Sequence, residues 1–207
     1  MEGKKIKKQR KEKTEKEMIK EISSWEKIYI GIDNGTTGAI GIIDGANVSM
    51  VRMPIKAEQS YTKTRQSITR VDYQEFYKII SEYENKTVLA VIERPMVNPL
   101  RFKASASALR CLEATLICLE QFKIPIMYCD SKEWQKVLLP HLIPIKKKGK
   151  KLNIREKVAK KKKEERKTQL KKDSLDIAQR LFPKIDYTGF KDGDSLLIAE
   201  WARRMNF

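Results

Sequence analysis

Two apolar stretches joined by a short polar turn, Ile28 to Asp44 (IYIGIDNGTTGAIGIID), constrain the fold of this chain more than any other feature. Residues 28–32 are bulky at every position except Gly31, which is typical of a strand buried on both faces. The turn is rich in residues that tolerate positive φ, so 39–43 is expected to return as the second strand of a hairpin. Asp33 lies where the first strand leaves the core, and its carboxylate must be solvated, paired or bound to a cation.

The rest of the chain alternates between strand and helix patterns. The patterns predict further strands over 47–55, 87–95 and 124–130, and a polar connection over 60–70. They predict helices over 71–85, 105–122, 131–140, 173–183 and 192–204. The first of these helices is expected to be N-capped by Asp72, and the third by Asp130 or Ser131. The early hairpin is antiparallel, whereas the strand–helix–strand steps imply parallel strands. The sequence therefore predicts an α/β fold with a mixed five-stranded sheet and helices on both faces.

Basic charge is concentrated in two segments. The chain carries 44 Lys plus Arg against 27 Asp plus Glu, a net charge of +17. Residues 1–27 hold 10 basic and 6 acidic side chains, and residues 146–172 hold 15 and 3. We expect a domain over 28–207 that is near-neutral outside a Lys-rich insertion at 146–172, with a basic helical N-terminal extension at 1–27. Nucleic acid is the commonest partner for such a charge pattern, and a solubilising tail is the alternative.

The remaining composition restricts the setting of the protein. The cysteines lack a metal-like spacing, and their odd number argues against a disulfide framework, so we expect a reduced, cytoplasmic protein. No apolar run approaches the ~20 residues that span a bilayer, and 1–27 lacks the apolar core of a secretory signal, so no membrane partner is expected. The one histidine, His141, is expected on the surface, which leaves little for histidine-based nucleophilic or zinc chemistry.

Acidic residues stand at the ends of three predicted elements. Asp33 follows the first strand, Glu93 ends the strand 87–95, and Asp194 lies in the first turn of the last helix, with Asp192 two residues earlier. Each position also has a purely structural interpretation. Asp33 could form the turn, Glu93 could pair with Arg94, and Asp192 could cap the helix.

These residues and their surrounding motifs resemble the ribonuclease H-like nucleases, and within them the RuvC-type Holliday junction resolvases of the phage-like branch. The motifs are GIDNGTTGAI, VIERPMVNP, the Ser/Ala-rich start of the helix at 105, SKEWQKVL, KKDSLDIAQRLFP and DGDSLLIAEWARR, and they run in order from Ile28 to Arg204. The resemblance implies a ribonuclease H-like fold. It also implies a metal-dependent endonuclease that cleaves phosphodiester bonds in Holliday junctions or other branched DNA.

The resemblance further implies two Mg²⁺ ions per site, with Mn²⁺ as a substitute. Asp33 would bridge the two ions, and Glu93 and Asp194 would complete the site. Such a pair, about 4 Å apart, activates a water and neutralises charge on the phosphate, and Mg²⁺ prefers oxygen ligands. The family usually has His or Asp three residues before the last Asp, where this chain has Lys191. Either Lys191 positions the phosphate or water, or Asp192 serves as the substitute ligand, and the sequence leaves both open.

Contacts with DNA and with a second subunit follow from the same resemblance. The family often has an aromatic wedge three residues after the strand-end Glu, where this chain has Met96, with Phe102 nearby. Basic residues expected to contact phosphates rather than bases are Arg94, Arg101, Lys103, Lys132, Lys136, Lys146, Lys147, Lys148 and Lys172. A homodimer would place one site on each of two opposing strands of a four-way junction, with the helix 105–122 as the candidate dimer face and burial within one subunit as the alternative.

Three other interpretations compete with a junction resolvase. DNGTTGAI also resembles the first phosphate loop of actin-like sugar kinases, but the chain is too short for two such domains and lacks a later Gly-rich adenosine motif, so no nucleotide cofactor is expected. A nuclease of the same fold acting on another DNA or RNA structure is the nearest alternative. An inactive nucleic-acid-binding relative is the third.

Overall fold

The structure, a computed structural model, describes residues 27–59, 67–139 and 156–207. In the helix that contains the Lys-rich segment, side chains are described at Glu165 and from Lys167 onward. The predictions that lie outside the described residues concern the extension over 1–26, His141, Lys146, Lys147 and Lys148. No helix in the described ranges is long and apolar enough to cross a membrane.

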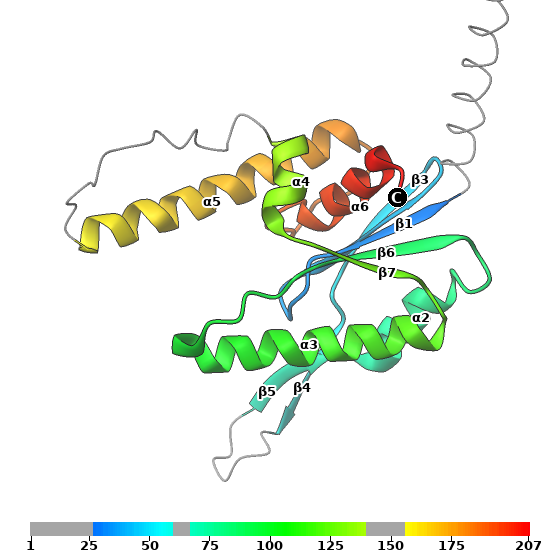
Figure 1. Ribbon diagram of the computed structural model, residues 1–207, viewed down its shortest axis with the longest axis horizontal. Helices are drawn as coiled ribbons and strands as arrows, with labels where there is room; N and C mark the ends of the chain where they lie inside the picture. Colours follow the sequence, from blue (N-terminus) through cyan, green and yellow to red (C-terminus); the bar gives the residue numbers. More distant parts are fainter. Residues whose placement is uncertain (1–26, 60–66, 140–155) are drawn as a thin grey trace, which may run out of the picture.

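A mixed five-stranded sheet forms the centre of the fold (Figure 1). Its strands lie in the order β3-β2-β1-β6-β7; β1 pairs antiparallel with β2 and parallel with β6, and β7 runs parallel to β6. This order and these directions are those of the ribonuclease H-like fold, so the predicted fold class is confirmed. The bounds are β1 Ile28–Ile32, β2 Ala39–Asp44, β3 Asn47–Arg52, β6 Val88–Glu93 and β7 Ile126–Cys129.

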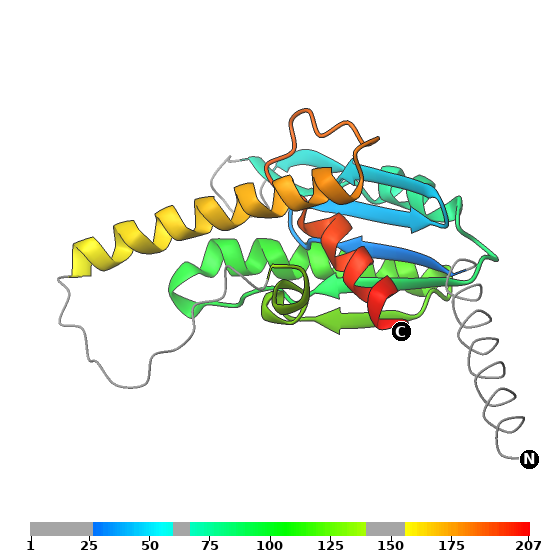
Figure 2. The ribbon, with the colours of Figure 1, turned by 90° about the horizontal axis from the view of Figure 1, so that it is seen from above.

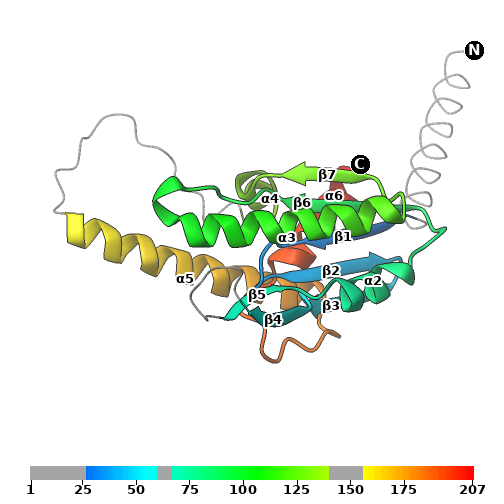
Figure 3. The same cartoon turned by 90° about the horizontal axis from the view of Figure 1, so that it is seen from below.

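Helices cover both faces of the sheet (Figures 1 and 3). Along β1 and β6, successive side chains alternate between two buried clusters. Ile30 and Ile92 pack with residues of α2 and α3, whereas Tyr29 and Val91 pack with residues of α4, α5 and α6. Because both faces are covered, every position of these strands is apolar or glycine until Glu93. The helix bounds are α2 Tyr73–Ser81, α3 Phe102–Gln121, α4 Ser131–Leu138, α5 Glu156–Leu181 and α6 Asp194–Met205.

Local capping signals located several helix starts correctly. The Asp72 side chain accepts a hydrogen bond from the backbone N–H of Gln74 at the start of α2. Asp130 and Glu133 form a capping box at the start of α4, which settles the choice between Asp130 and Ser131. The long helix α3 begins at Phe102, three residues before its predicted start, after the short 3-10 turn η1 (Pro99–Arg101).

Two regions differ from the sequence-based expectation. The third strand ends at Arg52, and a separate hairpin of β4 (Ile55–Gln59) and β5 (Ser67–Val71) occupies part of the expected polar connection. The helix expected over 173–183 begins at Glu156, so the described part of the Lys-rich insertion belongs to one 26-residue helix. Lysine has a high helix propensity, but a helix with little apolar surface shows no periodicity that would reveal it.

Helix α6 lies unusually close to the sheet because of two paired glycines. Gly31 of β1 is in register with Gly41 of β2. A Cβ at Gly31 would lie 2.1 Å from the carbonyl oxygen of Ser195, and a Cβ at Gly41 would lie 2.5 Å from the backbone nitrogen of Leu196. Only glycine permits this backbone-to-backbone contact. The residues from Ser195 to Ala202 are all buried as a result.

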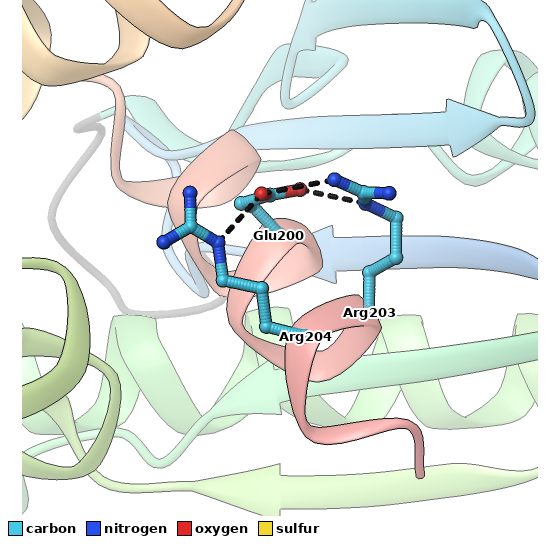
Figure 4. A network of polar contacts seen from close by, with 3 residues as sticks. All are labelled: Glu200, Arg203 and Arg204. Atoms are coloured by element: carbon cyan, nitrogen blue, oxygen red, sulfur yellow. Dashed lines mark hydrogen bonds and ion pairs between the residues drawn. The ribbon is translucent and has the colours of Figure 1, made fainter. Parts of the chain in front are cut away.

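The C-terminal end of α6 is held by a buried ionic network (Figure 4). Glu200 has a side chain only 3% exposed. Arg203 donates to it through Nε at 2.8 Å and Nη2 at 3.1 Å, and Arg204 donates through Nε at 2.8 Å. A carboxylate that is buried in this way requires such charged donors, and the network ties the last turn of α6 together.

Candidate active site

Two neighbouring strand ends bring Asp33 and Glu93 to one edge of the sheet. β1 and β6 are parallel, and Ile32 is in register with Ile92. Asp33 directly follows β1 and Glu93 is the last residue of β6, so both lie at the carboxyl edge of the sheet. The charge of Glu93 raises the pKa of Asp33, as expected for two carboxylates in electrostatic contact.

The start of α6 brings two further carboxylates to the same place. Asp194 is the first residue of α6, and Asp192 lies two residues before it. The charges of Asp192, Asp33 and Glu93 all raise the pKa of Asp194. Four carboxylates from β1, β6 and the start of α6 therefore form one cluster, which we call the carboxylate cluster: Asp33, Glu93, Asp192 and Asp194. Their catalytic and metal-binding roles remain predictions.

Burial and mutual repulsion both disfavour charge in this cluster. Burial is the main cause that raises the pKa of Asp33 to about 7, and the charges of Glu93 and Asp192 add to it. The pKa of Glu93 is raised mainly by burial, against an opposing hydrogen bond from the Ser131 side chain. Burial likewise raises the pKa of Asp194 well above its ordinary value. The cluster therefore holds more carboxylates than nearby positive charges can balance.

Helix α5 supplies two residues of the site that the sequence did not reveal. The Lys171 ammonium lies 2.5 Å from Asp192 Oδ2. Ser174, one turn further along α5, donates its hydroxyl hydrogen to Asp194 and accepts from the backbone N–H of Gly193 at 3.0 Å. Lys171 and Ser174 are spaced three apart, so they share one helix face, and this spacing was the only signal available in the sequence.

Around the start of α6, the positions of Asp192 and Lys191 differ from the sequence-based expectation. Gly193 occupies the N-cap position without a side-chain cap, so Asp192 does not cap the helix and is instead buried against Lys171. Lys191 is exposed. Lys171, rather than Lys191, is the cation whose charge opposes the raised pKa of Asp33 and Glu93. A role for Lys191 in positioning phosphate or water stays a prediction.

The donor set of the cluster suits hard divalent cations. Its side chains offer carboxylate oxygens, together with the Ser174 hydroxyl, and Mg²⁺ and Mn²⁺ prefer oxygen ligands. Among the described residues, no three acidic, histidine or cysteine side chains are close enough to hold one ion in the arrangement present. The pKa values of Asp33, Glu93 and Asp194 are raised, so their charged forms are disfavoured. A bound cation would supply positive charge that favours these charged forms.

Basic and apolar side chains surround the same edge of the sheet. Arg94 directly follows Glu93, pairs with Asp130 at 3.2 Å and lies over the ring of Tyr128. The loop and turn between β6 and α3 expose large apolar side chains: Met96 (82%), Val97 (56%), Leu100 (94%) and Phe102 (76%). The other described residues predicted to contact DNA are all exposed: Arg101, Lys103, Lys132, Lys136 and Lys172.

Helix α5 extends past the carboxyl edge of the sheet, at the end where η1 also lies (Figures 1 and 2). Its C-terminal part packs against α6, and Ala178 belongs to the buried cluster on that face. The Lys-rich first half of α5 therefore continues directly from the turn that carries Lys171 and Ser174. We call residues 156–172 of α5 the basic arm.

Comparisons with known proteins give a limited result. No family model matches the chain. No curated protein matches it in sequence. Among solved structures, it is similar to Thermus thermophilus RuvC in complex with a Holliday junction substrate (11% identity, 86% of this chain and 96% of that chain covered, TM-score 0.48). It is also similar to the Thermus thermophilus RuvC structure (12% identity, the same coverage, TM-score 0.46). Similarity at such identities concerns the fold alone.

Proposed function

We propose that this protein is a metal-dependent endonuclease that cleaves phosphodiester bonds in branched DNA, with four-way junctions as its principal substrate. The observation that carries the proposal is the convergence of four carboxylates from three elements beside a basic helix, with raised pKa values at Asp33, Glu93 and Asp194. Clustered carboxylates of perturbed pKa are typical of functional sites. The choice of branched DNA rests on the co-linear sequence motifs.

The chemistry assigned to the cluster is that of a two-metal hydrolase. Asp33, Glu93 and Asp194 would hold the ions, with Asp192 as a further ligand. Two bound divalent cations would activate water and stabilise the leaving oxygen. The residues of this chain have separate tasks. Ser174 fixes the orientation of Asp194, and the Ser131 hydroxyl near Glu93 favours its charged form, which is the form that binds a cation.

The basic arm is suited to bind the phosphate backbone. Its described lysines, Lys167, Lys171 and Lys172, lie within one and a half turns of the helix, next to the carboxylate cluster. Phosphate contacts of this kind give affinity without reading sequence. The DNA would therefore be recognised through its branched shape, while Arg94, Lys132 and Lys136 hold the strands near the cluster.

The apolar loop between β6 and α3 gives a reason to expect distorted DNA. Met96, Val97 and Leu100 are exposed, although exposed large apolar side chains in a row are unusual on a protein surface. Apolar wedges of this kind insert between bases and unstack them. Because the loop begins directly after Glu93, a wedge here would hold the strand to be cut close to the carboxylates.

A homodimer would match two cuts on opposing strands. Helix α3 exposes Leu109 (44%) and Ile117 (49%) on its outer side, two turns apart. Apolar residues at this spacing mark the face of a helix that packs on a partner. We propose α3 as the dimer face. A protein with this substrate is expected in the cytoplasm.

The experiment is a cleavage assay on three synthetic DNA substrates of matched sequence: an immobile four-way junction, a flap and a linear duplex. We expect cleavage of the junction with Mg²⁺ or Mn²⁺ and none with EDTA. Asp33→Asn, Glu93→Gln and Asp194→Asn should each abolish cleavage while junction binding persists. Equal cutting of the linear duplex would contradict branch selectivity, and full activity of any one variant would remove that acid from the mechanism.

A further inference from the structure

The ammonium of Lys171 occupies a position where a metal cation would be expected. Its Nζ lies 2.5 Å from Asp192 Oδ2, a close contact between an ammonium and a carboxylate. The Asp192 side chain is 10% exposed and the Lys171 side chain is 53% exposed, so the lysine reaches a buried carboxylate from the solvent side. A buried carboxylate of this kind needs a positive partner.

Carboxylates from three elements interact electrostatically with Lys171. Asp33 comes from β1, Glu93 from β6, and Asp192 and Asp194 from the start of α6. Burial lowers the pKa of Lys171, but the hydrogen bond and charge of Asp192 and the charges of Asp194 and Asp33 raise it overall, and the lysine in turn opposes the raised pKa of Asp33 and of Glu93. The lysine therefore favours the charged forms of Asp33 and Glu93 in addition to pairing with Asp192.

The turn of α5 that carries Lys171 is held in place by Ser174. Ser174, three residues later on the same face of α5, bonds both to Asp194 and to the backbone N–H of Gly193. This pair of hydrogen bonds fixes the turn of α5 that carries Lys171 against the start of α6. The Lys171 side chain is 53% exposed, so it can turn toward solvent without breaking the hydrogen bonds of Ser174.

We propose that Lys171 is a built-in counter-charge that occupies Asp192 in the metal-free protein and competes with divalent cations for that carboxylate. The inference rests on the proposed metal site. In the metal-free protein the lysine limits repulsion within the carboxylate cluster. When a divalent cation binds Asp192, the ammonium leaves toward solvent. Lys171 is thus a positioning residue that makes the site weaker for metal and the metal-free fold more stable.

The test measures Mn²⁺ binding to the full-length protein in the absence of DNA, from the electron paramagnetic resonance signal of the free ion. Removing a competing charge next to a partly buried site should tighten binding about tenfold in Lys171→Met. Lys171→Gln should behave similarly and guards against a folding defect of the first variant. Lys171→Arg retains the charge and should bind Mn²⁺ like the wild type. In metal-free buffer, Lys171→Met should also unfold at a lower temperature than the wild type.

Two controls separate a specific effect from a general change in charge. Lys167→Met removes the same charge one turn earlier on α5 and should change Mn²⁺ affinity by less than about twofold. In an Asp192→Asn background, Lys171→Met should no longer tighten binding, because the carboxylate for which the two cations compete is gone.

The outcomes distinguish this inference from the proposed function. Wild-type Mn²⁺ binding that is lost in Asp33→Asn but unchanged or weaker in Lys171→Met and Lys171→Gln would overturn the inference and leave the metal site standing. If neither the wild type nor the Lys171 variants bind Mn²⁺, or if binding ignores Asp33→Asn, both proposals fall. Tighter binding in Lys171→Met that persists with Asp192→Asn would also contradict competition at Asp192.

Discussion

Replacing Asp33 with asparagine should stabilise the metal-free protein at neutral and alkaline pH. Burial and the neighbouring carboxylates raise the pKa of Asp33 from its ordinary value of 3.8 to about 7. The folded protein therefore binds this proton more tightly than the unfolded chain does. Stability is greatest below the unfolded-state pKa and falls as the pH rises from about 4 through about 7, because the unfolded chain ionises more easily.

The size of the effect follows from the shift. One pKa unit corresponds to about 1.4 kcal/mol, so a shift of roughly three units lowers the free energy of unfolding by up to about 4 kcal/mol above pH 7. Asp33 retains part of its surface in contact with water, which screens the charge and brings the expected figure to about 2 kcal/mol. Asparagine has nearly the same shape and cannot ionise. In a chain of this length, about 2 kcal/mol corresponds to roughly 4–8 °C in melting temperature.

The assay is thermal and urea unfolding of the wild type and Asp33→Asn in EDTA across a range of pH. The two proteins should have similar stability near pH 4, and the variant should be more stable by about 2 kcal/mol near pH 8. Asp176→Asn, which changes an exposed carboxylate of α5, is the control and should show no such pH-dependent gain. Mg²⁺ should stabilise the wild type but not Asp33→Asn. A variant that is equally stable or less stable than the wild type at pH 8 would refute the argument.

Two further predictions concern the approach of α6 and the basic arm. Gly31→Ala places a Cβ 2.1 Å from the carbonyl oxygen of Ser195, so α6 should move outward by about 1 Å. This shift should destabilise the fold by about 1–3 kcal/mol and lower the rate of junction cleavage by about 100-fold. The control variant Ala57→Val, at an exposed position, should have neither effect. Unfolding and single-turnover cleavage rates measure both effects, and unimpaired cleavage would show that α6 has room. Replacing Lys167 and Lys172 with Gln should reduce the slope of log affinity for junction DNA against log salt concentration by nearly two. An unchanged slope in a binding titration would mean that neither lysine contacts phosphate.

The central strands could be predicted from sequence because both faces of the sheet are covered. β1 and β6 have bulky apolar residues at nearly every position, a pattern that few other structures produce. The hairpin of β4 and β5 was missed because its residues are mostly polar or exposed, so it lacks the buried apolar run that marks the central strands. The length of α5 was missed for a related reason. Its first half is rich in Lys and Glu and carries no apolar stripe in the sequence.

The acidic part of the candidate site could be inferred, whereas its partners on α5 could not. Asp33 and Glu93 stand out because a charge directly after a buried strand is conspicuous, and parallel neighbours place such charges side by side. Lys171 is one lysine among many in its segment, and Ser174 is an ordinary helix residue in sequence. They meet Asp192 and Asp194 across about twenty residues of chain only because α5 folds back onto the start of α6, a contact that depends on tertiary packing.

The packing of α6 against the sheet determines the geometry of the carboxylate cluster, because Asp194 is the first residue of α6. The cluster lowers the stability of the metal-free protein, because burial and repulsion disfavour the charged forms of Asp33, Glu93 and Asp194. Helix α6 nevertheless holds Asp194 in the cluster, since the glycine pair lets its backbone rest directly on β1 and β2 and Glu200 anchors its far end. Loosening α6 would relieve the repulsion and gain stability there only by giving up buried contact with the sheet. The tight contact therefore maintains an electrostatically unfavourable arrangement that a divalent cation would turn into a favourable one.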